Sequence, residues 1–557
     1  MPMRLVIIRD PYNAHSVPHR AASPDVGRVP PCASIGNFAK VNTMTGFRTA
    51  PFWLVMACVG CSTDFTPAAA YLPHTCSVDD DCADPTTAMV CELQSSKPTC
   101  IKASDATLII GESAPLSGTN QALGTAMKLG IDMAFKEQNA AGGVRGRMLQ
   151  LDFRDDAYQP DIAESAARAL IDVVEIKGQP PMCPSTSMKL TGNAVAISSD
   201  ALSRGPNAVL AILGNVGTPT TMRSAPIALE TGTVFFGAFT GASTLLRDTT
   251  AGPCERYIFN VRASYAEEAQ ATMEFFQNRG ITDLNNLISF DQNDSFGQAG
   301  YDGLVAAYKS TIGPFPPGTD STTPIFRQRY DRNNENSVPA MLQLTEDHLN
   351  TLLANAAGGS VTVGIMMTDT YGAAAQFIQG LRTWQFVNDT AQTQLQRASK
   401  LHLFFSNISF VGADALADRL KSAGLVPLSG SAHFTDNVVV SQVVPNYQSD
   451  ASEVVTSYLK LMMGTTNTPS FTSLEGYVSA RVFIAGLLLH KGPFTAASLV
   501  DTFETLPDLA LGIGGTSGFS TTNHQYSNSV WGTQIKTDGS FQNLYFWSKD
   551  HEIQFYE

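Results

Sequence analysis

From residue 105 onward, hydrophobic positions recur along most of the chain with either the spacing of a strand or the spacing of a helix. Residues 107–111 form a short apolar run that ends in glycine, which predicts a buried strand. Leu123, Met127 and Ile131 follow at helical spacing, and residues 141–143 end that helix. The same rhythm predicts further strands at residues 149–153, 208–214, 234–240, 286–291, 361–368 and 401–407. Repeated β-α units are typical of parallel sheets covered by helices, so the pattern predicts an α/β fold with two lobes.

The main apolar run near the N-terminus is residues 51–60, which is shorter than the roughly 18 residues that a spanning helix needs. Its length, with Arg48 before it and small residues after it, indicates a signal-peptide core. We expect residues 44–61 to be the signal peptide, with Met44 as the start, and residues 1–43 to be a non-native extension or disordered. A genuine N-terminal extension is the alternative.

The end of this segment resembles a bacterial lipoprotein signal, in which a cysteine that follows small residues receives the lipid. Cys61 and Cys58 both fit that description. Cleavage before Cys61 leaves six cysteines that can pair completely in an oxidising compartment, whereas cleavage before Cys58 leaves an odd thiol. The resemblance implies a protein held at the membrane by a lipid, in the periplasm or at the cell surface. A plain secretory peptide without lipid is the alternative.

Residues 62–104 are expected to form a small cysteine-rich tether. A segment this short cannot bury a core of its own, so we expect two disulfides to stabilise its fold. The cysteine spacings lack the C-x-x-C pairs of common zinc sites, and the acidic run 79–81 fits a solvated turn better than a calcium site. The four cysteines of the tether are Cys76, Cys82, Cys91 and Cys100. Parity then predicts a bridge between Cys183 and Cys254, with two separate buried thiols as the alternative.

Composition narrows the classes of function. The chain has 557 residues, of which 43% are hydrophobic and 15% charged, as in a large globular protein. Its formal net charge of -14 argues against a nucleic-acid partner, because phosphate binding needs a basic face. There is no H-E-x-x-H, G-x-S-x-G or phosphate-loop motif, and residues 512–515 fit a turn better than a dinucleotide loop. We expect a protein that binds rather than catalyses, with no cofactor and no metal.

Small polar residues follow the predicted strands of the first lobe. In open α/β sheets, ligands bind beyond the carboxyl ends of the strands. Hydroxyl groups and backbone N–H groups at a helix N-terminus suit a carboxylate, although Thr218 or Thr220 could instead cap the helix that begins there. The candidate ligand-binding residues at these strand ends are Ser117, Thr218, Thr220, Thr240 and Gly241.

Four stretches of the chain resemble the type I periplasmic binding proteins, the leucine/isoleucine/valine-binding family. The first, residues 106–175, contains TLIIGESAPLSG and KLGIDMAFKEQNAAGGVRGRMLQLDFRDD, and the other three are residues 214–243, 290–304 and 473–489. The resemblance runs in the family's order over roughly residues 105–550. It implies two Rossmann-like lobes with parallel sheets, joined by three hinge crossovers. The implied boundaries are 105–261 and 441–530 for lobe 1, and 262–440 and 531–557 for lobe 2.

The resemblance also implies a function and ligand contacts in lobe 2, namely Phe296, Asp369 and Tyr371. The family's glutamate for an amino-acid ammonium group corresponds to Ala373 here, which puts an α-amino-acid ligand in doubt, although Asp369 could substitute. The implied function is an extracytoplasmic receptor that closes on a small polar ligand, such as an amino acid or amide, and presents it to an ABC permease. A sensory receptor of the same fold, a surface adhesion or scaffold lipoprotein, and a hydrolase are the alternatives; the hydrolase lacks a nucleophile–base pair.

Overall fold

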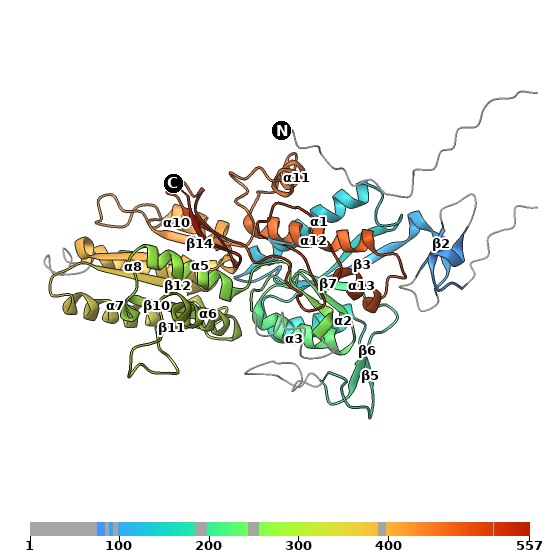
Figure 1. Ribbon diagram of the computed structural model, residues 1–557, viewed down its shortest axis with the longest axis horizontal. Coiled ribbons are helices and arrows are strands. Elements are labelled where there is room, and N and C mark those ends of the chain that lie inside the picture. Colours follow the sequence, from blue (N-terminus) through green and yellow to red (C-terminus); the bar gives the residue numbers. More distant parts are fainter. Residues whose placement is uncertain are drawn as a thin grey trace, which may run out of the picture. The chain divides into compact units, whose positions relative to one another are not determined.

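The chain is organised around two sheets with helices on both faces (Figure 1). The structure is a computed structural model. It describes residues 75–83, 89–92, 98–183, 198–242, 255–387, 397–515 and 517–556, and residues 71–557 form one compact unit. The predicted signal peptide, both candidate lipidation cysteines and Cys254 lie outside the described residues.

The first sheet, with its helices, forms lobe 1. Its five strands are all parallel, in the order β4-β3-β7-β8-β9. Their bounds are β3 (Thr107–Ala114), β4 (Met148–Asp155), β7 (Ala211–Leu213), β8 (Val234–Phe236) and β9 (Ile258–Phe259). The helices are α1 (Gln121–Ala140), α2 (Pro160–Leu170), α3 (Thr218–Glu230), α11 (Glu453–Met462), α12 (Phe471–Leu489) and α13 (Ala496–Phe503). A short antiparallel ribbon, β5 (Val174–Ile176) with β6 (Ala201–Ser203), lies between α2 and β7 in sequence.

The second sheet, with its helices, forms lobe 2. It has eight strands in the order β11-β10-β12-β13-β14-β15-β16-β17. Their bounds are β10 (Leu287–Gln292), β11 (Phe326–Tyr330), β12 (Val361–Thr368), β13 (Leu401–Asn407), β14 (Val438–Gln442), β15 (Val530–Ile535), β16 (Phe541–Ser548) and β17 (His551–Phe555). The helices are α5 (Tyr265–Asn278), α6 (Ser295–Thr311), α7 (Val338–Asn355), α8 (Tyr371–Phe386) and α10 (Ala413–Ala423), with a short 3-10 turn η6 (Ser409–Val411).

The predicted α/β fold with two lobes is confirmed, with one local exception. The neighbouring strands β11, β10, β12, β13 and β14 pair in parallel in that order. The strands β15, β16 and β17, which follow β14 in the sheet, pair antiparallel. The turn between β15 and β16 is closed by a bond from Lys536 N to Ser540 O of 2.8 Å. A parallel partner would need a crossover of about a dozen residues or more, so this short turn forces the antiparallel arrangement.

Three crossovers connect the lobes, as predicted. The chain leaves lobe 1 after β9, returns after β14, and leaves again before β15. The first and third crossovers run side by side, because Asn260 N donates to His524 O and Tyr526 N donates to Asn260 O, each at 2.8 Å. The residue boundaries placed at 261, 441 and 530 stay a prediction.

The α12 helix is the core helix of lobe 1. It has 19 residues with a mean hydropathy of 1.2, so among the described residues it is the one helix long and apolar enough to cross a membrane. However, 78% of that apolar window is buried inside the protein, where α12 packs along α1. Glycines permit the close contact: a β-carbon at Gly130 would lie 2.0 Å from Ser473 O, and one at Gly476 would lie 2.3 Å from Met127 O.

The cysteine-rich segment is a small disulfide-bonded module, as predicted. Cys76 pairs with Cys91 and Cys82 pairs with Cys100, with Cα–Cα distances of 5.7 and 5.4 Å. The module consists of a 3-10 turn at Asp79–Cys82 and two short strands, β1 (Met89–Cys91) and β2 (Cys100–Lys102). Cys183, in lobe 1, is also disulfide-bonded. Its predicted partner, Cys254, lies outside the described residues, so that pairing stays a prediction.

Ion pairs and a hydrogen bond hold the disulfide-bonded module against lobe 1. Asp79 forms ion pairs with both Arg145 and Arg147, and Arg147 also donates to Cys91 O at 3.2 Å. Both guanidinium groups lie over the Phe494 ring. Burial acts to raise the pKa of Asp79, but the hydrogen bond and charge of Arg147 outweigh it and lower that pKa. Asp79 is thus committed to two arginines, which argues against the calcium alternative.

Replacing Asp79 by asparagine should release the module from lobe 1. The change leaves the nearly buried Arg147 without its carboxylate, at a local cost of about 1–3 kcal/mol. Backbone amides of residues 98–102 should then exchange with solvent about tenfold faster or more. Asp80→Asn is the matched control, because that neighbouring side chain is exposed. Equal exchange in the two variants would show that the disulfides alone hold the module in place.

Candidate functional site

The carboxyl ends of β7 and β8 bring two threonine hydroxyls together. Gly217, at a φ of 99°, turns the chain into α3, whose first residue is Thr218. Thr240 follows β8, and its hydroxyl oxygen lies 2.7 Å from that of Thr218. Both side chains are buried. Two adjacent hydroxyls at the N-terminus of a helix of 13 residues can donate to a carboxylate or another anionic oxygen.

Tyr265, the first residue of α5, places a third hydroxyl beside this pair. Gly241 permits the approach, because a β-carbon there would lie 2.4 Å from the tyrosine ring. The Tyr265 hydroxyl faces Thr240 and Thr218, but it is buried without a hydrogen-bond partner. Burial raises the pKa of Tyr265, so its hydroxyl keeps a proton that it can donate. The three hydroxyls form one group of neutral donors.

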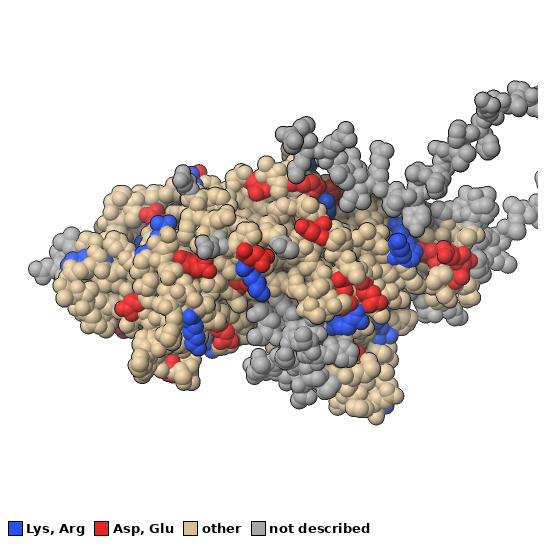
Figure 2. Space-filling model, viewed as in Figure 1, with Lys and Arg blue, Asp and Glu red and all other residues tan. Residues whose placement is uncertain are grey.

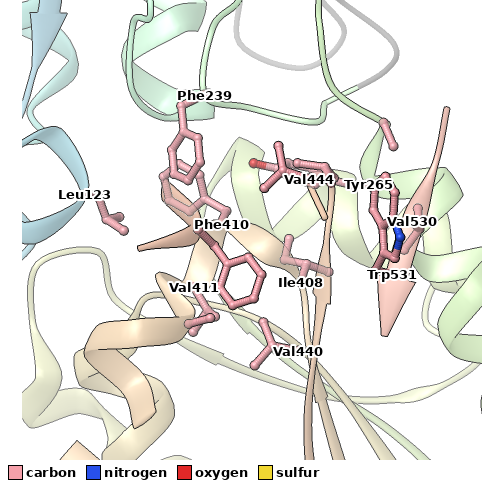
Figure 3. Close-up of a cluster of buried hydrophobic side chains, with 14 of the residues drawn as sticks. Leu123, Phe239, Tyr265, Ile408, Phe410, Val411, Val440, Val444, Val530 and Trp531 are labelled. Atoms are coloured by element: carbon pink, nitrogen blue, oxygen red, sulfur yellow. The ribbon is translucent and has the colours of Figure 1, made fainter. Parts of the chain in front are cut away.

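Five aromatic rings form a continuous cluster beside these hydroxyls, where the lobes meet. Phe410, on η6 of lobe 2, has its ring centroid 6.0 Å from that of Tyr158 and 5.0 Å from that of Phe239, both in lobe 1. Phe296 lies 4.6 Å from Phe410 and 5.5 Å from Tyr265. Figure 3 shows Phe239, Phe410 and Tyr265 converging from different parts of the chain. We call these five residues the ring cluster.

The predicted lobe 2 residue Phe296 belongs to this cluster, whereas Asp369 stands apart from it. The backbone N of Phe296 donates to Asp294 Oδ1 at 2.9 Å, so Asp294 caps α6 and fixes the ring. Asp369 follows β12 and is fully buried, and neither of its carboxyl oxygens has a hydrogen-bond partner. Burial raises the pKa of Asp369 well above its usual range, and the neighbouring Asp291 raises it further. The carboxyl group of Asp369 therefore holds its proton more tightly than an exposed aspartic acid does.

Three other predicted residues have different roles from those expected. Tyr371 donates its hydroxyl proton to Thr119 O, so it ties lobe 2 to lobe 1 at the surface end of the cleft. The Thr220 hydroxyl donates to Gly217 O at 2.9 Å within its own helical turn, which leaves it neither capping α3 nor free for a ligand. Ser117 is exposed and hydrogen-bonds to Asp155 on the edge strand β4, away from the hydroxyl group.

Polar contacts close the lobes on each other in this structure. Asn120 donates to Asn333 Oδ1 at 2.8 Å, and Gln292 donates to the Tyr158 hydroxyl at 3.3 Å. Asn120 and Tyr158 belong to lobe 1, and their partners belong to lobe 2. Thr218, Thr240 and Phe296 are each at most 1% exposed. A solute can reach them only when the lobes separate.

A buried arginine joins the lobes on the hinge side. Arg262 lies in the first crossover and pairs with Glu268 of lobe 2 at 2.7 Å and with Glu475 of lobe 1 at 3.2 Å. Glu268 also accepts from Ser409 N at 2.7 Å and from Ser441 Oγ at 2.5 Å. Burial acts to lower the pKa of Arg262, but the charges of Glu475 and Glu268 raise it, so the guanidinium stays charged. Its carbon also lies 5.3 Å from the Phe239 ring centroid, next to the ring cluster.

Asp156, at the end of β4, should make the stability of lobe 1 depend on pH. It accepts from Ser113 Oγ at 2.7 Å and from Tyr158 N at 2.9 Å. Burial raises its pKa from 3.8 to about 7. The stability that neutral Asp156 contributes is fully present below its ordinary pKa and is lost as the pH rises through about 7.

Asp156→Asn should therefore remove a decline in stability on the order of 2–4 kcal/mol between acidic and neutral pH. Thermal midpoints measured at several pH values check this, with the exposed Asp302→Asn as the control. If the variant and the parent lose stability in parallel as the pH rises, another group carries the dependence.

Sequence reasoning missed four residues of the ring cluster, Tyr158, Phe239, Tyr265 and Phe410. Phe239 directly precedes Thr240, and Phe410 lies three residues after β13, so the strand-end rule could have found both. Tyr158 carries no such signal, because it reaches the cleft through a backbone φ of 59°, which residues other than glycine rarely adopt.

On the face shown in Figure 2, acidic and basic side chains are interspersed rather than gathered by sign.

Known proteins share this fold. The model of the periplasmic binding protein family matches residues 107–180 and 204–540. A possible leucine/isoleucine/valine-binding protein from Rhodopirellula baltica has a similar structure, with 29% identity, a TM-score of 0.59, and coverage of 80% of this chain and 98% of that one. A fatty acid ABC transporter substrate-binding protein from Thermomonospora curvata shares the fold, with 14% identity, a TM-score of 0.52, and coverage of 79% and 91%.

A curated relative matches over a shorter segment. The Leu/Ile/Val-binding protein homolog 2 of Brucella abortus is 37% identical over 66 residues, which are 12% of this chain and 18% of that relative. The chain thus spans less than a fifth of that relative's length in this match. The family model covers most of the chain, in both lobes. The chain therefore belongs to the periplasmic binding protein family, as a binding protein rather than an enzyme.

Proposed function

We propose that this protein closes its two lobes on one small solute and presents it to the permease of an ABC importer. The observation that carries this proposal is the meeting of the Thr218–Thr240 hydroxyl pair with the ring cluster, which draws on both lobes. A solute bound there touches lobe 1 and lobe 2 together only when the lobes are closed. That difference in contacts is what allows a ligand to shift the equilibrium toward closure.

We assign the ligand contacts to Thr218, Thr240, Gly241 and Phe296 among the residues predicted from sequence. The first two offer hydroxyl donors, the glycine admits the Tyr265 ring, and Phe296 offers an aromatic face. Ser117 and Thr220 are not part of this assignment, because their hydroxyls are used elsewhere. The solute then needs one end that accepts hydrogen bonds and a body that packs against rings.

The test starts from the solute itself. Mass spectrometry of small molecules released from the purified protein, followed by thermal-shift screening of related compounds, should yield a ligand. Small-angle scattering with and without that ligand then measures closure, and we expect the radius of gyration to fall at saturation. A saturating ligand that leaves the scattering unchanged would contradict closure of the lobes as the mechanism.

We also propose that a lipid on Cys61 or Cys58 holds the protein at the membrane. The supporting observation is the apolar segment with its small residues ahead of both cysteines. Cells supplied with a labelled fatty-acid analogue should transfer the label to the parent protein and not to a variant with both cysteines replaced by serine. Label that persists in the double variant would rule the anchor out.

A further inference from the structure

We propose that the solute is an aromatic monocarboxylate without an ammonium group. The inference rests on the proposed function, since it names the class of solute that the same cleft takes. Three features of the cleft favour this class of solute: the ring cluster suits an aromatic ring, the hydroxyl group suits a carboxylate, and the carboxylates that pair with arginines beside the ring cluster are already occupied.

The ring cluster provides aromatic surface from both lobes. Phe410 contacts rings of lobe 1 on one side and Phe296 on the other, and these contacts are tilted, with interplanar angles of 31° to Phe239 and 58° to Phe296. Aromatic side chains prefer such offset and edge-to-face contacts with centroids about 4.5–7 Å apart. When the lobes open, Phe410 and Phe239 part and each exposes a ring face. An aromatic solute that enters there restores on both sides the contacts that opening breaks.

The hydroxyl group lies next to those rings and is made of neutral donors. Thr218 and Thr240 lie at the N-terminus of α3, where the helix dipole favours an anion. The second, independent observation is the Tyr265 hydroxyl, which is buried, faces both threonines and has no hydrogen-bond partner. A buried hydroxyl without a partner costs stability unless a ligand accepts from it. A carboxylate has enough acceptor sites for all three hydroxyls.

Two sets of charged side chains near the ring cluster are already paired. Arg262 pairs with both Glu268 and Glu475, and Glu268 also accepts from Ser409 N and Ser441 Oγ. Asp294, which acts electrostatically on Tyr158, pairs with Arg332 at 3.0 Å. The carboxylates of these ion pairs are therefore already occupied and are not free for an ammonium group.

Three buried acids without an ion pair could change this conclusion, namely Asp369, Asp156 and Glu112, but burial raises the pKa of each and so favours the neutral form. Asp369 has Asp291 and Tyr330 as neighbours rather than a ring of the cluster, and burial raises its pKa well above its usual range. An ammonium group buried without a partner carries a large desolvation cost. A solute with a ring and a carboxylate alone avoids that cost, so the paired charges favour the monocarboxylate over the amino acid.

Three probes separate the two ends of the solute: 3-phenylpropanoate, L-phenylalanine and 2-phenylethylamine share a benzene ring on a two-carbon chain. Titration calorimetry on the full chain should show that 3-phenylpropanoate binds about tenfold tighter than L-phenylalanine or more, and that 2-phenylethylamine does not bind. Tighter binding of L-phenylalanine, lost in Asp369→Asn, would overturn the inference and assign Asp369 to an ammonium group. Failure of all three probes would also overturn it, while a co-purified solute that closes the lobes would still support the proposed function.

A pair of leucine variants tests the ring contacts. Phe410→Leu keeps an apolar side chain but removes the ring that both lobes contact, so the affinity for 3-phenylpropanoate should fall about tenfold. Phe377→Leu is the matched control, because Phe377 is equally buried in lobe 2 but stacks on Phe290, away from the cleft. Equal affinities in the two variants would show that the ring cluster is only core. Thermal midpoints confirm that both variants are folded before they are compared.

Discussion

Replacing Thr240 by valine should weaken ligand binding about tenfold to a hundredfold. The substitution keeps the shape of the side chain but removes one hydroxyl of the pair at the N-terminus of α3. A hydrogen bond to a charged group contributes about 1.5–3 kcal/mol, which corresponds to that range of affinity. The hydrogen bond from Thr240 to the ligand contributes more in the closed cleft than it would in water, because the hydroxyl pair is shielded from solvent once the lobes meet.

Titration calorimetry with the co-purified solute measures this effect, and the chain offers a matched control. Thr435 is also buried, but its hydroxyl has no hydrogen-bond partner. Thr435→Val therefore removes a hydroxyl from the interior without removing a hydrogen bond, and it should leave the affinity unchanged. If Thr240→Val binds as tightly as Thr435→Val, the hydroxyl pair is part of the core and not of the binding site.

Replacing Arg262 by methionine should be the most destabilising of the changes considered. Its partners Glu268 and Glu475 are almost completely buried, and both would lose their counter-charge. Breaking a buried ion pair by removing one partner costs about 3–5 kcal/mol. Serine donors from η6 and β14 would still reach Glu268, but neutral hydroxyls do not supply the missing positive charge.

Differential scanning calorimetry should show a lower thermal midpoint for Arg262→Met than for the parent. Arg279→Gln is the control, because Arg279 is exposed on lobe 2 and packs over the Phe275 ring. A double variant, Arg262→Met with Glu268→Gln, should recover part of the loss, since it removes one of the two unpaired carboxylates. If the single variant is as stable as the control, the hinge does not depend on this network.

The fold could be predicted because strand and helix periods are local properties of the sequence. The predicted strands 361–368 and 401–407 coincide with β12 and β13, which are buried and strongly apolar. The strands predicted at 208–214 and 234–240 are shorter in the structure, as β7 and β8. Apolar residues such as Phe239 continue those runs after the ladder has ended, since they pack in the cleft instead of the sheet.

The position of a candidate site residue could be predicted only where the end of a single strand determines it. Thr218, Thr240 and Phe296 each follow a strand by four or five residues, so the strand-end rule predicts that they lie near one another. Tyr158 and Phe410 join the site only because the other lobe approaches them, and no local pattern encodes that approach. Hydroxyl groups are also ambiguous in sequence: Thr220 lies two residues from Thr218, yet it bonds its own helical turn.

The double arginine clamp on Asp79 has a mechanical consequence. Two disulfides make the module inextensible, and the clamp fixes it to the α1–β4 loop and to Phe494, all in lobe 1. Any pull on the chain ahead of Thr75 is therefore transmitted to lobe 1 and not to the hinge. Lobe 1 then stays fixed while lobe 2 moves relative to it. A force on the N-terminal segment therefore neither opens nor closes the cleft around the solute.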